Sequence, residues 1–190
     1  MLFLGAFIGY LWGQDMAEFK EFILPMAMGY IVFCMSAVAG KWANEIKSPY
    51  TFLIPDTPMK KLWYATVMEH IKSVITGALF AIPVGIIMKL PPHQVLLSII
   101  FFACLQACKI YNTVLAEVMV GNVMGKTGKQ LFIMLLQGIV LSIVAAVAVI
   151  GTVAASIEVG YLLMIGVLVV LAFALMTAAN ICFDKMEIVE

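Results

Sequence analysis

Residues 131–154 read LFIMLLQGIVLSIVAAVAVIGTVA, and this stretch decides the fold class. It contains no charged side chain, and about 20 apolar residues are enough for a helix to cross the roughly 30 Å hydrocarbon core of a bilayer. Further apolar stretches of sufficient length lie at residues 21–40, 62–89, 94–115 and 159–183. The sequence therefore predicts an all-α, polytopic protein whose helices span a membrane.

The composition of the whole chain supports this prediction. Of the 190 residues, 64% are hydrophobic and only 12% are charged, whereas soluble domains are about 45–50% apolar and about 25% charged. All eleven basic residues are lysines and the formal net charge is zero, so we expect no basic face for nucleic acid. The four cysteines show no CxxC spacing, which indicates neither a zinc site nor a redox pair. We expect no cofactor and no metal site.

The first residues, MLFLGAFIGYLWG (1–13), are apolar but too few to cross a bilayer. They lack a basic beginning and a small-residue cleavage site, so we do not expect a signal peptide. We expect either the end of a truncated spanning helix or an interfacial segment. The prediction is thus a single transmembrane domain over residues 1–190 with about six transmembrane segments, the first of them short or truncated.

Lysines are distributed unevenly between the predicted connections. One side of the membrane would carry Lys41, Lys47, Lys60, Lys61, Lys126, Lys129 and Lys185, and the other side only Lys20 and Lys89. Basic residues are retained in the cytoplasm, so we expect loops 41–61 and 116–130 and the C-terminus to be cytoplasmic. The protein is therefore predicted to be a multi-pass protein of the cell membrane.

The stretch KSPYTFLIPDTPMKKLWYATVMEHIK (residues 47–72) interrupts the apolar pattern. Thr57 and Pro58 are typical of the N-cap and first residue of a helix, because the hydroxyl can accept a free N–H and proline has none to leave unpaired. A helix over 58–89 would be roughly 48 Å long, which exceeds the hydrocarbon core. We therefore expect a cytoplasmic elbow loop at 41–61 that leads into an amphipathic helix start in the headgroup region.

Lys60 and Lys61 lie in the first turn of this predicted helix, where they oppose the helix dipole. Helix stability alone does not favour them, so we expect an anionic lipid or a protein partner outside the helix to interact with them. The preceding segment SPYTFLIP is apolar and is held extended by its prolines. It either packs on its own bundle or forms a docking surface, and the sequence leaves both alternatives open.

Residues 49–61 carry the pattern PY-x-[FY]-LIP-x-[ST]-P-x-KK, which resembles the motif of a family of ABC exporters from Firmicutes. The matching residues are Pro49, Tyr50, Leu53, Ile54, Pro55, Pro58, Lys60 and Lys61. The stretch is also similar, more loosely, to the cytoplasmic elbow of ABC-2-type permeases, which lies beside the nucleotide-binding subunit. The resemblance implies the permease subunit of an ABC exporter, coupled to a separate ATPase subunit through loop 47–72 and acting as a dimer or with another permease half. It also implies a longer protein, of which the chain is a C-terminal portion.

The chain itself contains no ATP-binding motif. The segment GNVMGKTGKQ (121–130) resembles a phosphate-binding loop, but that motif requires glycine five residues before Gly125, where Val120 stands. Apart from Glu69 and Glu21, the first residue of the stretch 21–40, the predicted membrane helices contain no acid, so we expect no catalytic site. The alternative function is a small transporter independent of an ATPase, or a substrate-binding membrane subunit. That alternative predicts a substrate site near the midplane, with one helix break marked by Pro83 and Gly85.

Gln106, Lys109 and Thr113 are spaced i, i+3 and i+7 and share one face of the predicted helix at 94–115. A cation within a membrane helix is a functional candidate, so these residues are candidates for a substrate pathway. The alternative is that the Lys109 side chain extends to the cytoplasmic headgroups or bonds to a neighbouring helix. The sequence leaves both alternatives open.

Overall fold

The computed structural model describes residues 20–36, 56–120 and 125–189. These residues form the helices α2 (Lys20–Ser36), α5 (Pro58–Met88), α6 (Pro92–Val120), α7 (Lys126–Ala154) and α8 (Ile157–Val189). The described ranges contain no strand. The prediction of an all-α protein is therefore confirmed.

Within the described residues, the four helices α5 to α8 are long and apolar enough to cross a membrane, and α2 is a shorter apolar helix. They cover the predicted spans, although each of the four long helices extends a few residues beyond at least one predicted boundary. The predicted first segment at 1–13 lies outside the described residues, as does the end of the predicted span at 21–40. The count of about six segments therefore remains a prediction.

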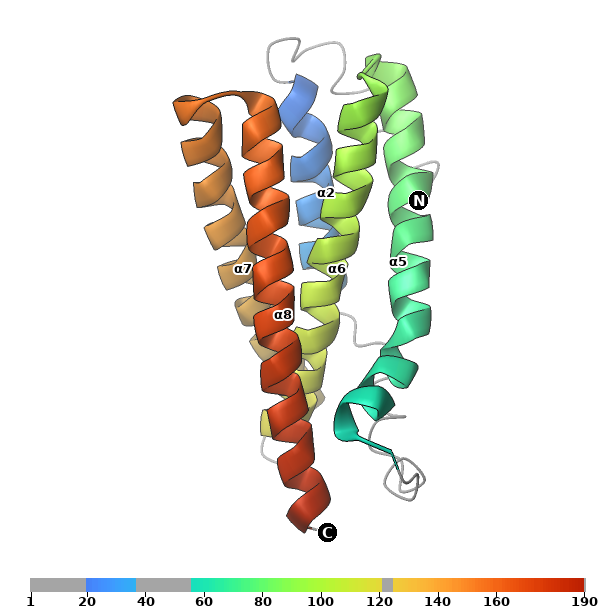
Figure 1. Cartoon of the computed structure of the whole chain (residues 1–190), viewed down its shortest axis with the longest axis vertical. Coiled ribbons are helices and arrows are strands. Elements are labelled where there is room, and N and C mark those ends of the chain that lie inside the picture. Colours follow the sequence, from blue (N-terminus) through green and yellow to red (C-terminus); the bar gives the residue numbers. More distant parts are fainter. Residues whose placement is uncertain (1–19, 37–55, 121–124, 190) are drawn as a thin grey trace.

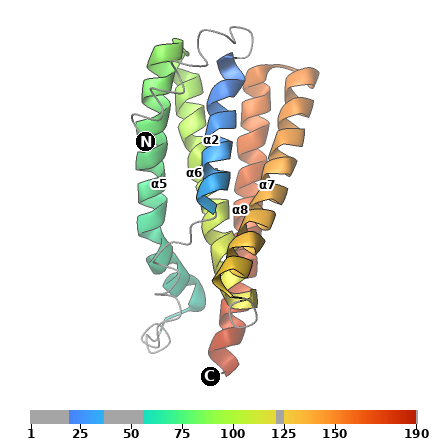
Figure 2. The same ribbon diagram turned by 180° about the vertical axis from the view of Figure 1, so that it is seen from behind.

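The long helices α5, α6, α7 and α8 run alternately up and down and form a bundle (Figure 1). Seen from behind, α2 lies in front of the bundle between α5 and α7 (Figure 2). The central helix is α6, because it packs against each of the other four described helices. Its buried side chains include Phe101, Phe102 and Leu105, each at most 3% exposed. The bundle is thus organised around α6.

The up-and-down order groups the charged ends of the helices. The start of α5, the end of α6, the start of α7 and the end of α8 lie at one end of the bundle, which is the lower end in Figure 1. Lys60 and Lys129 belong to helix segments at this end, whereas Lys89 caps α5 at the other end. This grouping agrees with the predicted separation of the lysines. Which end faces the cytoplasm remains a prediction.

The helix α5 continues without interruption through Pro83 to Met88. The helix break that the ATPase-independent alternative predicts at Pro83 and Gly85 is therefore absent from this helix. α5 ends at Lys89, whose φ of 54° is left-handed, and the N–H of Leu90 donates to the Gly85 carbonyl over 2.9 Å. A left-handed residue at this position satisfies the last carbonyls of a helix, and it allows α6 to begin only a few residues later.

The connection between α6 and α7 is much shorter than the predicted loop 116–130. Helix α6 continues to Val120 and α7 begins at Lys126, so both ends of the predicted loop are helical and its boundaries were wrong. The physical reason is that Gly121 is the first helix-weakening residue after α6 and Gly125 occupies the N-cap position of α7. Between these glycines nothing in the sequence requires a longer loop.

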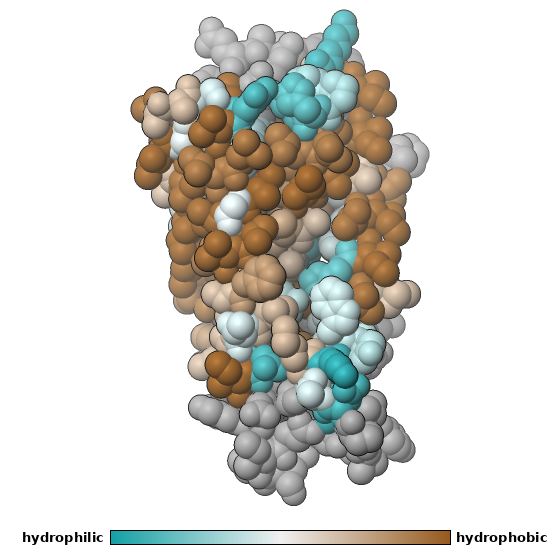
Figure 3. All heavy atoms as spheres, viewed as in Figure 1, coloured by the Kyte–Doolittle hydropathy of each residue, from teal (hydrophilic) through white to brown (hydrophobic). Residues whose placement is uncertain are grey.

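The face of the bundle seen in Figure 3 is mainly hydrophobic, and its hydrophilic residues gather mostly toward the two ends of the described part. Large exposed apolar side chains occur along all the long helices, for example Ile86 on α5, Val153 on α7 and Val170 on α8. Exposed apolar surface of this extent marks contact with a membrane or with another protein, and on helices long enough to cross a bilayer it indicates lipid. The structure thus supports the prediction that the bundle spans a membrane.

Candidate functional site

The start of α5 turns away from the long axis of that helix and lies against the neighbouring helices (Figure 1). The backbone at Thr57 is extended, and its carbonyl accepts the N–H groups of Lys60 and Lys61 at 3.0 and 3.1 Å. The predicted N-cap position is therefore correct. The predicted capping by its hydroxyl is wrong, because that side chain makes no capping hydrogen bond.

Leu62 attaches the start of α5 to the bundle. Its side chain is only 2% exposed and belongs to a cluster with Ile110, Tyr111, Val114 and Leu115 of α6 and Ala179 of α8. Burial of a leucine side chain is worth about 1.5–3 kcal/mol. The first turns of α5 are therefore fixed to two helices at once.

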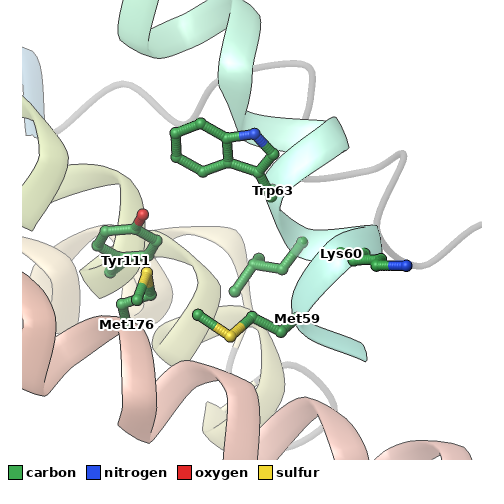
Figure 4. A pocket seen from close by; sticks show the side chains of 6 residues that line it. Met59, Lys60, Trp63, Tyr111 and Met176 are labelled. Atoms are coloured by element: carbon green, nitrogen blue, oxygen red, sulfur yellow. The ribbon is translucent and has the colours of Figure 1, made fainter. Parts of the chain in front are cut away.

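An open cavity of about 260 Å³ lies between the start of α5 and these two helices. It is lined by Met59, Lys60, Leu62, Trp63, Tyr111 and Met176. Figure 4 shows Tyr111 and Met176 across from the side chains of α5, with the ammonium of Lys60 directed away from the cavity. The lining is thus almost entirely apolar, with one cation at its rim.

A second contact between α5 and α6 lies two helical turns beyond Leu62. The Tyr111 hydroxyl lies 3.4 Å from Nε2 of His70, and the His70 ring stacks on Trp63 with 5.6 Å between ring centroids. These three side chains form a continuous row from the cavity to the shaft of α5. A displacement of the start of α5 must therefore either move α6 or break this row.

The residues predicted to couple to a partner fall into three groups. Pro49, Tyr50, Leu53, Ile54 and Pro55 lie outside the described residues. Pro58 is the first residue of α5. The two lysines differ, since Lys60 is exposed and pairs with Asp56 over 3.2 Å, whereas Lys61 is only 5% exposed.

This difference between the two lysines separates their roles. From the sequence we expected both lysines to interact with a lipid or a partner outside the helix. In the structure only Lys60 presents its ammonium to the surroundings, with 63% of its side chain exposed. Beside it, Trp63, Tyr64 and Met68 are also exposed, each at 51% or more. The outward surface at the start of α5 is therefore apolar and aromatic, with Lys60 at its edge.

Two further ion pairs lie at this end of the bundle. Lys72 pairs with Glu69 within α5, with 2.8 Å between Nζ and Oε1. Lys129 of α7 pairs with Glu117 of α6 over 3.0 Å, and these two side chains are only 19% and 12% exposed. The second pair joins the end of α6 to the start of α7, so it keeps these two helix ends together.

The predicted pathway residues are largely enclosed. Gln106 and Thr113 are 9% and 2% exposed, and Lys109 is half-buried. The hydroxyl of Thr113 donates to the carbonyl of Lys109 over 2.9 Å, so it is used within α6. Their role in a pathway remains a prediction.

A buried amide pair between α6 and α7 was not foreseen from the sequence. Nδ2 of Asn112 donates to Oε1 of Gln137 over 3.1 Å, and Nε2 of Gln137 lies 3.4 Å from the carbonyl of Leu105. Both amide side chains are 0% exposed. The available signal was Gln137 itself, which is the only amide in the apolar stretch 131–154.

Comparison with known proteins adds the family. Residues 1–187 match the family described as "Putative ABC exporter". No curated protein matches the chain, and no solved structure matches it. The match covers almost the whole chain and includes the elbow motif and all five described helices. The chain belongs to this ABC exporter family.

Proposed function

We propose that the chain is the permease part of an ABC exporter that couples to a separate ATPase subunit through residues 47–72. Membership of the exporter family supports a membrane component of such a transporter. The sequence contains no phosphate-binding loop at Gly125, so ATP hydrolysis is assigned to the partner. Two copies of the chain, or this chain and another permease half, would surround the substrate.

The proposed coupling is mechanical. Closure of the ATPase on ATP pushes the elbow, and the start of α5 passes the displacement to α6 through Leu62 and the row formed by Trp63, His70 and Tyr111. The bundle then changes between two packed arrangements, which is how membrane transporters commonly expose a site alternately. Packed helices suit this role because they shift between discrete arrangements rather than deform continuously.

One observation carries the proposal. The start of α5 contacts both α6 and α8 through a buried leucine, while its other side presents an exposed lysine and exposed aromatic side chains. A segment with one side fixed in the bundle and the other available to a partner is what a coupling element requires. By comparison, the helix break that would favour an ATPase-independent transporter is absent from α5.

The test is co-purification from native membranes of the tagged full-length protein in mild detergent. We expect an ATPase subunit in stoichiometric amount. Lys60→Glu reverses the exposed charge and should reduce the recovered ATPase at least about tenfold, as expected for loss of one charge contact at an interface. Lys61 is unsuitable for this test, because a charge reversal at a buried lysine would also disturb folding.

The matched control is Lys72→Glu. Lys72 is the last residue of the segment 47–72 and lies about three turns from Lys60 on the same helix. It is equally exposed at 64% and also forms a short-range ion pair, but it is outside the elbow motif at 49–61. This variant should retain the ATPase. Recovery of the protein without any ATPase under the mildest solubilisation would instead support the partner-free alternative.

A further inference from the structure

The cavity at the start of α5 is placed where a lipid of the surrounding membrane can reach it. Its lining is apolar except for Lys60, and the neighbouring Trp63 and Tyr64 are exposed. Tryptophan and tyrosine are enriched at the level of the lipid headgroups. A cavity beside such side chains suits the boundary between headgroups and acyl chains.

The charge at this end of the bundle is nearly balanced, with a small positive excess. Residues 56–72, 117–129 and 183–189 contain six lysines (Lys60, Lys61, Lys72, Lys126, Lys129 and Lys185) and five acids (Asp56, Glu69, Glu117, Asp184 and Glu187). At the cavity itself, Lys60 pairs with Asp56 among the described residues, and 63% of the lysine side chain is exposed. Exposed pairs of this kind contribute little to stability, so the ammonium can exchange Asp56 for another anion at small cost.

We propose that the cavity is a binding site for an anionic phospholipid. One acyl chain enters the space between Met59, Leu62, Trp63, Tyr111 and Met176. The phosphate of the headgroup stays outside the rim, on the side toward which the Lys60 ammonium is directed, and is bound by it there. The lipid then fills the gap under the start of α5 and fixes its position on α6 and α8. The proposal does not depend on an ATPase partner, so its failure would leave the proposed function untouched.

Trp63 is a built-in reporter for this site, because it lines the cavity and is one of three tryptophans in the chain. Replacing Trp12 and Trp42 by phenylalanine leaves Trp63 as the only tryptophan. The full chain is placed in phosphatidylcholine vesicles that contain an increasing fraction of lipid with brominated chains, which quench tryptophan on contact. The brominated lipid is either phosphatidylglycerol, which is anionic, or phosphatidylcholine, which is zwitterionic.

We expect brominated phosphatidylglycerol to give the same quenching of Trp63 at about one-fifth of the lipid fraction that brominated phosphatidylcholine needs. A factor of about five corresponds to the attraction of one lysine for an anionic lipid. Lys60→Gln should bring this ratio close to one. Lys72→Gln is the matched control for the general positive charge of this end, and it should retain the ratio. Met176→Phe should fill the cavity from α8 and weaken quenching by both lipids.

Equal quenching by the two lipids in the unmodified protein would overturn the proposal. So would a preference for phosphatidylglycerol that survives Lys60→Gln, or quenching that is unchanged by Met176→Phe. A further contrary result is Trp63 fluorescence that responds to the purified ATPase subunit but to neither lipid, since the cavity would then hold a side chain of that protein. The emission maximum of Trp63, unchanged in Lys60→Gln, checks that the start of α5 keeps its place.

Discussion

Leu62→Ala should release the start of α5 from the bundle. The leucine side chain is 2% exposed and contacts residues of both α6 and α8, and removal of a buried leucine side chain costs about 2–5 kcal/mol. An existing cavity lies beside it, so the truncated site becomes larger. Because the first turns of α5 have few other buried side chains, this cost should appear as local opening of that segment rather than as unfolding of the bundle.

Hydrogen exchange followed by mass spectrometry measures this opening. We expect the amides of the first turns of α5 to exchange at least about tenfold faster in the variant, because the free energy of local opening sets their exchange rate. The remaining part of α5 and the amides of α6 should change little. The matched control is Leu79→Ala, on the same helix but 45% exposed. Equal acceleration in both variants would contradict the role assigned to Leu62.

The same variant also separates binding of the ATPase from transmission of its movement. Lys60 faces outward in the structure, so Leu62→Ala should still recover the ATPase subunit. The ATP-induced change of the bundle should be lost, because the elbow would move without displacing α6. A variant that loses the ATPase altogether would show that Leu62 supports the docking surface instead.

The second large effect concerns the buried amide pair. Gln137→Met should leave Nδ2 of Asn112 without its acceptor in α7, and Oδ1 of Asn112 already has no partner among the described residues. A buried amide without a partner costs about 1–3 kcal/mol. Measured hydrogen bonds between membrane helices average about 0.6 kcal/mol with a maximum of about 1.7, so we expect a loss of about 1–2 kcal/mol.

A double-mutant cycle tests this expectation. Asn112→Leu and Gln137→Met should each destabilise the protein. The double variant should lose less stability than the sum of the two single losses, since it removes both polar groups. Unfolding of the purified protein by dodecyl sulfate gives the four free energies. Strictly additive effects would mean that the two amides do not interact. The control is Ser142→Ala, whose hydroxyl is exposed and bonds only within α7.

The positions of the helices could be predicted from the sequence because the helix is the conformation in which a long apolar stretch is stable in lipid. Backbone groups in a bilayer must be bonded within the segment, so residues 131–154 could only be helical. Thr57 and Pro58 located the start of α5 correctly for a local reason, the missing N–H of proline. Hydropathy was less successful at 116–130, because the polar residues between the apolar stretches 94–115 and 131–154 were taken as a loop, whereas α6 continues to Val120 and α7 begins at Lys126.

The candidate site depends on how the helices pack against one another, which patterns within one segment of sequence do not reveal. Lys60 and Lys61 are adjacent in sequence, and which of them is buried depends on the rotation of the first turns of α5 against the bundle. The pairing of Asn112 with Gln137 depends on the rotation of α6 against α7. The cavity lies between side chains of three helices that are distant in sequence, such as Met59 and Met176, so the sequence could indicate an amphipathic elbow but not the space beneath it.

The central claim is that the start of α5 is where the ATPase subunit acts. The most direct test is site-specific photocrosslinking, with a benzoylphenylalanine residue in place of Tyr64, which is 67% exposed beside Lys60, in the full-length protein in native membranes. We predict a crosslink to an ATPase subunit from this position. Position 86 is the control, because Ile86 is 71% exposed and lies near the opposite end of the same helix, so it should give none. Crosslinks to the ATPase from position 86, or none from position 64 while the ATPase is present in the membrane, would contradict the account.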